Sequence, residues 1–90
     1  MPFETEQEAI ALANCTDFGL SSNVWTENPE RGQKIASQLR AGTVWINGHF
    51  IRNLNAPFGG MKSSGIGRQG GRYSMEFYSE PKVACIAKHE

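Results

Sequence analysis

The sequence predicts an α/β protein, and three observations support this fold class. Patterns typical of helices alternate with short runs of β-branched and aromatic residues along the 90 residues. Capping residues mark where two helices begin. A glycine-rich connection at residues 47–72 separates the first four elements from the last two. So few strands leave bare sheet edges, which pair with a larger fold or with another chain.

The first helix is predicted to begin after Thr5. The run Thr5-Glu6-Gln7-Glu8 matches a capping box, in which the Thr5 hydroxyl accepts from the Glu8 amide and the Glu8 carboxylate reaches back to Thr5. One apolar stripe at helical spacing follows: Ala9, Ile10, Leu12 and Ala13. Gly19 is expected to take a positive φ that ends the next connection. The residues from Leu20 to Thr26 then form a short strand.

The second helix has signals at both ends. Asn28 suits the N-cap, and Pro29 suits the first helical position, where no hydrogen bond is lost. Gly42 is expected to end this helix as its C′ residue. The run Thr43-Val44-Trp45-Ile46 is rich in β-branched and aromatic residues and predicts a buried strand.

The segment 47–72 holds seven of the ten glycines and reads as a long loop. Loops of this length in compact domains are usually functional or disordered. Its apolar side chains count against simple disorder: Phe50, Ile51, Leu54, Phe58, Met61 and Ile66.

Two short elements are predicted after the loop. Residues Tyr73 to Ser79 form a helix with Tyr73 and Phe77 stacked one turn apart, and Pro81 prevents its continuation. An apolar run from Lys82 to Lys88 predicts a final strand.

The composition argues against several functional classes. Nine basic and nine acidic residues give zero net charge, whereas a nucleic-acid-binding protein normally carries a basic stripe. No apolar run approaches the roughly 18 residues that span a membrane, and the N-terminus lacks the pattern of a signal peptide. Two distant cysteines indicate free thiols in a reducing compartment. We therefore expect a cytoplasmic protein without nucleic-acid or membrane partners.

The run Gly65-Ile66-Gly67-Arg68-Gln69-Gly70 is a literal G-x-G-x-x-G. A dinucleotide site requires this motif to follow a parallel strand and to open a helix. The preceding residues 58–64 hold two glycines and no β-branched residue, so a glycine-rich structural loop is favoured. A small dinucleotide-binding domain is the weaker alternative.

No catalytic or metal-binding group stands out by spacing. Cys15 follows a helix C-terminus, where the dipole opposes a thiolate, and Cys85 lies in the apolar final run. Both are interpreted as buried or spectator thiols. His49 and His89 form no metal-ligand spacing with acidic residues, and His89 reads as a tail residue.

Arg52 lies in the long loop among apolar and aromatic residues. A guanidinium in such surroundings suits bidentate binding of a carboxylate. A solvated or structurally paired arginine is the competing interpretation, which composition alone favours.

Four blocks resemble the aldehyde dehydrogenase family in its order and spacing, and they cover nearly the whole chain. They are Glu8–Asn14 with Phe18–Leu20, Arg40–Asn47, Pro57–Arg68 and Glu76–Tyr78. The second and third blocks are highly specific. The run from Asn47 to Phe58 is similar to the 2-hydroxymuconic-semialdehyde and 5-carboxymethyl-2-hydroxymuconic-semialdehyde dehydrogenase branch.

The resemblance implies the C-terminal portion of an α/β catalytic domain over residues 1–79, with a substrate-entrance loop at 47–72. Residues 80–90 would be an oligomerisation strand and tail. The partners implied are the remainder of the enzyme and identical subunits in a dimer or tetramer. Lys62 and Gly65 match positions that line an intersubunit cation site in some relatives.

The resemblance also implies a mechanism for a complete enzyme. A cysteine attacks the aldehyde, hydride passes to NAD or NADP, and a glutamate activates water. Those residues would precede Met1, so this chain is expected to hold no catalytic or cofactor-binding residue, to bind no cofactor and to be inactive alone. Substrate binding is what carries over: Arg52 would bind the carboxylate of a semialdehyde, with Phe58 and Phe50 as pocket aromatics. The alternative is a self-associating or regulatory interaction module that uses the strand Lys82–Lys88.

Overall fold

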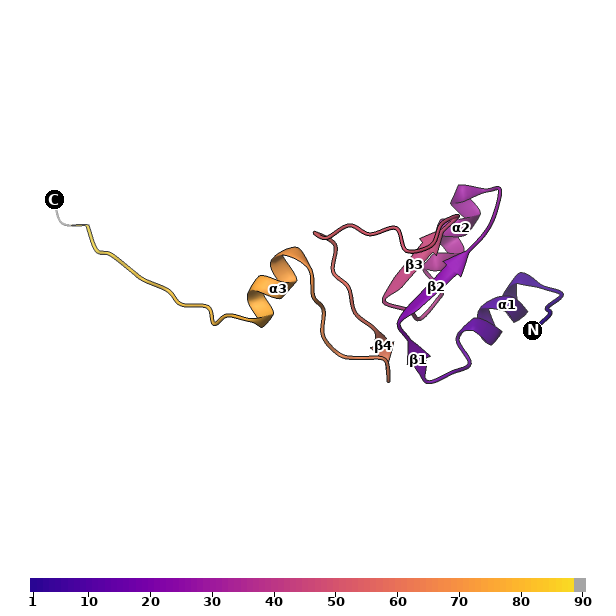
Figure 1. Ribbon diagram of the computed structural model, residues 1–90, viewed down its shortest axis with the longest axis horizontal. Helices are drawn as coiled ribbons and strands as arrows, with labels where there is room; N and C mark the ends of the chain where they lie inside the picture. The colour runs from indigo at the N-terminus through magenta and orange to yellow at the C-terminus, as the bar shows by residue number, and fades with distance from the viewer. Residues whose placement is uncertain (89–90) are drawn as a thin grey trace.

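The computed structural model describes residues 1–88 and contains mixed helices and strands, as the sequence predicts (Figure 1). The elements are α1 (Glu6–Ala13), β1 (Phe18–Gly19), β2 (Ser21–Val24), α2 (Pro29–Ala36), β3 (Thr43–Ile46), β4 (Met61–Lys62) and α3 (Gly71–Phe77). Strands β2 and β3 pair in parallel, from Ser21 opposite Thr43 to Val24 opposite Ile46. Helix α2 connects them and packs against both, which makes a βαβ unit.

Both predicted helix starts are confirmed. The Thr5 hydroxyl accepts from the Glu8 amide at 3.1 Å, and Glu8 Oε2 accepts from the Glu4 amide at 3.3 Å instead of that of Thr5. The side chain of Asn28 accepts from the amides of Glu30 and Arg31 at 3.1 and 3.2 Å. The two local patterns therefore fix where α1 and α2 begin.

The roles predicted for Gly42 and Gly19 are wrong. Helix α2 ends at Ala36 with Ser37 as its C-cap, well before Gly42. Gly19 lies in β1 and is not among the glycines with positive φ. Both allow close approach of distant backbone: a Cβ at Gly19 would meet the Arg40 carbonyl oxygen, and one at Gly42 would meet the Gly59 carbonyl oxygen.

The long loop is ordered by pairing with itself and with β1. Strand β4 pairs antiparallel with β1, from Phe18 opposite Lys62 to Gly19 opposite Met61. Phe58 and Gln69 exchange two backbone hydrogen bonds of 2.7 and 2.8 Å. The G-x-G-x-x-G run follows this antiparallel β4, so residues 58–71 lack the parallel strand that a dinucleotide loop requires.

In the last segment one prediction is corrected and another stays a prediction. The aromatic pair at α3 is Phe77 with Tyr78, at a centroid distance of 5.0 Å, and not Tyr73 with Phe77. Residues 82–88 are not paired as a strand within residues 1–88, which supply no ladder partner there. The oligomerisation strand predicted there would pair with a second chain and stays a prediction. Figure 1 shows this segment running away from the other elements. His89 and the end of the predicted tail lie outside the described residues.

A small core lies where α1, α2 and the β2–β3 pair meet. Ile10, Val24 and Leu39 are buried there and line one pocket beside α1. Ala41 and Trp45 are also buried, and Trp45 lies on the other face of β3, against the 47–72 loop, because its neighbour Ile46 faces α2. Trp45 is the one buried residue of strand β3, and the other three are half-buried. The prediction of a buried strand therefore holds at that position alone. Within residues 1–88, no helix is both long enough and apolar enough to cross a bilayer.

Candidate functional site

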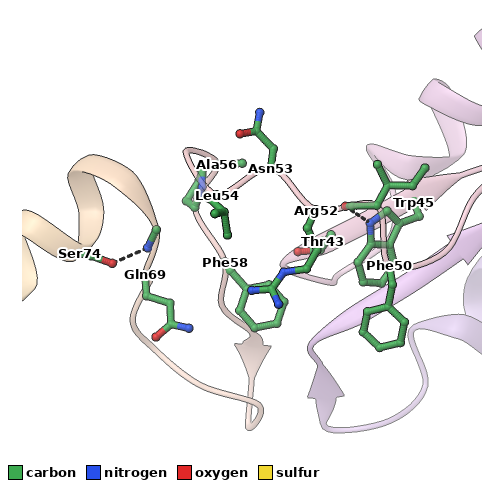
Figure 2. Close-up of a pocket in the computed structure, with 13 residues that line it drawn as sticks. Thr43, Trp45, Phe50, Arg52, Asn53, Leu54, Ala56, Phe58, Gln69 and Ser74 are labelled. Atoms are coloured by element: carbon green, nitrogen blue, oxygen red, sulfur yellow. Dashed lines mark hydrogen bonds between the residues drawn. The ribbon is translucent and has the colours of Figure 1, made fainter.

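A cavity of about 390 Å³ lies between strand β3, the first half of the 47–72 loop and the start of α3 (Figure 2). The three residues predicted to bind substrate all line it: Arg52, Phe50 and Phe58. Trp45 from β3 and Ser74 from α3 close it from either side. The structure thus brings the predicted site residues to one place.

Arg52 carries the charge of this cavity. Its side chain is exposed, and Figure 2 shows the guanidinium extending toward Phe58. The ion pairs found within residues 1–88 join Arg31 to Glu6 at 3.1 Å and Arg72 to Glu76 at 3.2 Å, and neither involves Arg52. Its N–H donors are therefore available to an acidic group in the cavity.

The two aromatic residues occupy different parts of the cavity wall. The Phe58 backbone is fixed by its pairing with Gln69, and the residue as a whole is 42% exposed. The Phe50 ring lies 5.5 Å from the Trp45 ring and 4.3 Å from the His49 ring, measured between centroids. Phe50 has a φ of 55°, in the left-handed region that a residue with a Cβ rarely adopts. Both rings offer apolar surface beside the guanidinium.

The sequence did not predict the residues that hold the loop in place. The indole Nε1 of Trp45 donates to the Ile51 carbonyl at 2.9 Å. The Asn23 amide donates to the Gly48 carbonyl at 2.8 Å and contacts His49 Nδ1 at 3.0 Å. One signal was available, since the N–H of a buried tryptophan needs an acceptor.

Other predicted groups lie elsewhere. Cys15 and Cys85 are free, as predicted, and both are exposed. Of their two interpretations, buried thiols is therefore wrong, and spectator thiols stays a prediction. Within residues 1–88 no three His, Cys, Asp or Glu residues gather as a metal site. The Lys62 ammonium donates to the carbonyls of Asn14 and Thr16, each at 2.9 Å. An intersubunit cation site at Lys62 and Gly65 would involve a second chain and stays a prediction.

The chain is similar to a family model and to several sequences of aldehyde dehydrogenases. The model of the aldehyde dehydrogenase family matches residues 1–84. A 2-hydroxymuconic semialdehyde dehydrogenase of Pseudomonas putida is 53% identical over 85 residues, which are 94% of this chain and 18% of that protein. A 2-aminomuconic semialdehyde dehydrogenase of Homo sapiens is 47% identical over 89 residues, or 99% of this chain and 18% of that protein. The chain thus spans less than a fifth of the length of these relatives.

Solved structures agree with this assignment. An aldehyde dehydrogenase from Bacillus cereus in complex with NAD⁺ superposes with a TM-score of 0.84 at 48% identity, over 89% of this chain and 16% of that one. One from Mycobacterium tuberculosis, also complexed with NAD⁺, gives 0.85 at 42% identity over the same shares. The predicted α/β class and the family resemblance are both confirmed, and the chain belongs to the aldehyde dehydrogenase family.

Proposed function

We propose that this chain is the C-terminal segment of an NAD- or NADP-dependent aldehyde dehydrogenase that oxidises a carboxylated, muconic-type semialdehyde to the acid. The observation that carries the proposal is Arg52, which has no acidic partner within residues 1–88 and lines a cavity with Phe50 and Phe58. The names of the 2-hydroxymuconic and 2-aminomuconic semialdehyde dehydrogenases among its relatives support the same substrate class.

In this proposal, the cavity recognises the two ends of the substrate's carbon chain differently. The planar guanidinium of Arg52 donates two parallel N–H···O bonds to the distal carboxylate. The rings of Phe50 and Phe58 pack against the apolar carbons between the carboxylate and the aldehyde. The distal charge thereby sets where along the entrance the aldehyde group lies.

The chemical step belongs to the rest of the enzyme. The bound nicotinamide cofactor would accept hydride from the substrate. The described residues do not fit that cofactor, because the glycine-rich run after β4 lacks a parallel strand before it. We therefore assign the cofactor, the catalytic cysteine and the glutamate base to other parts of the protein, and we expect this chain alone to be inactive.

The exposed apolar surface supports partners for this segment. Phe18, Leu20, Trp25 and Ile66 are large apolar side chains with exposures from 44% to 101%. Such surface in a family member is suited to contact with the remainder of the enzyme and with identical subunits. We propose residues 1–79 as part of the catalytic domain, 80–90 as the oligomerisation strand and tail, and the cytoplasm as the location.

Arg52→Ala in the complete enzyme tests the proposal. The KM for a carboxylated semialdehyde should rise roughly 10- to 100-fold, since a hydrogen bond to a charged group contributes about 1.5–3 kcal/mol. The KM for an uncharged aldehyde of similar length should stay within about twofold, as should kcat for both. Steady-state kinetics on the two substrates measures this.

Arg72→Ala is the matched control, because Arg72 is an exposed arginine on α3 whose ion pair with Glu76 lies outside the cavity. It should leave both KM values unchanged. An equal effect of Arg52→Ala on charged and uncharged aldehydes would make Arg52 a structural arginine and contradict the proposal.

A further inference from the structure

We propose that Trp45 is a positioning residue for Arg52, acting through the hydrogen bond from its indole to the carbonyl of Ile51. This inference rests on the proposed function, because it assigns Arg52 a substrate to bind. Trp45 itself lines the same cavity but offers its only polar atom to the loop (Figure 2).

The first step concerns the indole. Trp45 is 9% exposed and lies on β3, which is paired with β2 along its whole length. An indole N–H in such a place requires an acceptor, and the Ile51 carbonyl at 2.9 Å supplies it. Ile51 directly precedes Arg52, so the bond fixes the peptide plane from which Arg52 begins.

The second step concerns the backbone between these residues. Asn47 and Phe50 have φ values of 56° and 55°. Asparagine tolerates this left-handed region, whereas the side chain of Phe50 disfavours it. Such conformations persist only where surrounding contacts enforce them. Asn47 is held to the end of β2 and to Thr26: its amide donates to the Val24 carbonyl and its Oδ1 accepts from the Thr26 amide, each at 2.8 Å.

The far side of the turn depends on Trp45. The Phe50 ring packs against the indole ring at 5.5 Å, and the Ile51 carbonyl accepts its N–H. Trp45 therefore contributes two of the contacts that hold the turn in its strained form. Asn23 on β2 adds a third by binding the Gly48 carbonyl and His49.

The third step concerns Arg52 itself. Within residues 1–88, Arg52 forms neither a hydrogen bond nor an ion pair. Its placement in the cavity then follows from the residue before it. Because Ile51 is anchored by Trp45, the indole N–H determines where the guanidinium begins its approach to a carboxylate.

Trp45→Phe separates the hydrogen bond from the ring, since phenylalanine retains an aromatic face for Phe50 and removes the N–H. In the complete enzyme, the KM for a carboxylated semialdehyde should rise roughly fivefold, the scale of one lost neutral hydrogen bond. The KM for an uncharged aldehyde should rise by a clearly smaller factor, since Phe50 lies in the same loosened segment, and both kcat values should stay within about twofold. Trp25→Phe is the matched control, because Trp25 lies outside this cavity and lines a different one near α1.

The double variant W45F/R52A decides whether the two residues act together. If Trp45 acts through Arg52, the double variant should be no worse on the carboxylated substrate than R52A. Additive losses, or a KM increase that is equal for charged and uncharged aldehydes, would overturn the positioning role.

Amide hydrogen exchange over residues 48–54 separates this inference from the proposed function. Exchange should be faster in W45F than in the parent enzyme or in W25F. If R52A fails to discriminate between substrates, the proposed function fails, and faster exchange still supports the anchoring of the loop by Trp45. Unchanged exchange in W45F would overturn that anchoring whatever the kinetics show.

Discussion

Arg52 and Phe58 line the same cavity but offer a substrate different interactions. A guanidinium discriminates strongly, because an uncharged substrate leaves its N–H donors to water. Phe58, a residue that is 42% exposed, contributes apolar contact that depends on surface area and not on charge. The two residues should therefore produce distinct kinetic patterns when they are replaced.

Phe58→Ala should raise the KM for carboxylated and uncharged aldehydes alike, by about tenfold for the loss of roughly half a buried aromatic side chain. The backbone pairing of Phe58 with Gln69 does not involve the ring and is retained. Phe58→Leu is the control, since leucine keeps most of the apolar contact and should give a much smaller rise. An effect confined to the carboxylated substrate would instead make Phe58 a support for Arg52.

At the scale of elements, the start of β3 can lie against the loop that carries Phe58 because Gly42 has no side chain. Gly42 immediately precedes β3 and donates to the Gly19 carbonyl at 3.0 Å. A Cβ there would fall on the backbone carbonyl oxygen of Gly59, the residue after Phe58. Backbone atoms cannot turn aside as a flexible side chain does, so any larger residue must separate the loop from the strand.

Gly42→Ala should lower the free energy of unfolding by roughly 1–3 kcal/mol through this overpacking. It should also raise the KM for both aldehyde types, because it displaces the chain that carries Phe58. Gly67→Ala is the matched control in the 47–72 loop, since a Cβ at Gly67 would have no atom within 4 Å. Thermal melts of the complete enzyme measure the difference, and equal melting temperatures for the two variants would refute the close-approach role.

The sequence predicted the elements whose signals are local. The caps at Thr5 and Asn28 lie within three residues of the amides that they bind, so α1 and α2 could be located without knowing the rest of the fold. The clustering of Arg52 with Phe50 and Phe58 was predictable for the same reason, since all three lie within one short stretch of loop.

The rest depends on contacts between distant residues. Gly19 lies against the carbonyl of Arg40, and Gly42 lies against that of Gly59. The local interpretations, a turn residue for Gly19 and a helix end for Gly42, were therefore wrong. The predicted strand at 82–88 has no ladder partner within residues 1–88, and no run of apolar residues can supply one. Likewise, the β3 pattern indicated a strand but not that Trp45 would bind the Ile51 carbonyl.

On the scale of the whole molecule, the chain is extended. Its radius of gyration is 18.8 Å, whereas a compact domain of this length has about 12 Å. Its accessible surface is 7804 Å², while a compact monomer of this mass exposes about 5200 Å². No side chain within residues 1–88 has less than 2% of its surface exposed. The segment therefore buries too little apolar surface to offset its chain entropy by itself.

The isolated 90-residue chain should consequently fail to unfold cooperatively and should form no NADH from any aldehyde. Its five buried apolar residues remain 7–9% exposed, so a thermal scan should show a gradual change without a sigmoidal transition. Exposed apolar side chains such as Trp25 and Ile66 should bind the dye ANS strongly. The complete enzyme, in which other parts of the fold cover this surface, should show a sharp transition, weak dye binding and aldehyde-dependent NADH formation.

A cooperative melt of the isolated chain would mean that the small core between α1, α2 and the β2–β3 pair suffices for independent folding. Aldehyde-dependent NADH formation above the buffer background would mean that catalysis does not need residues outside this chain.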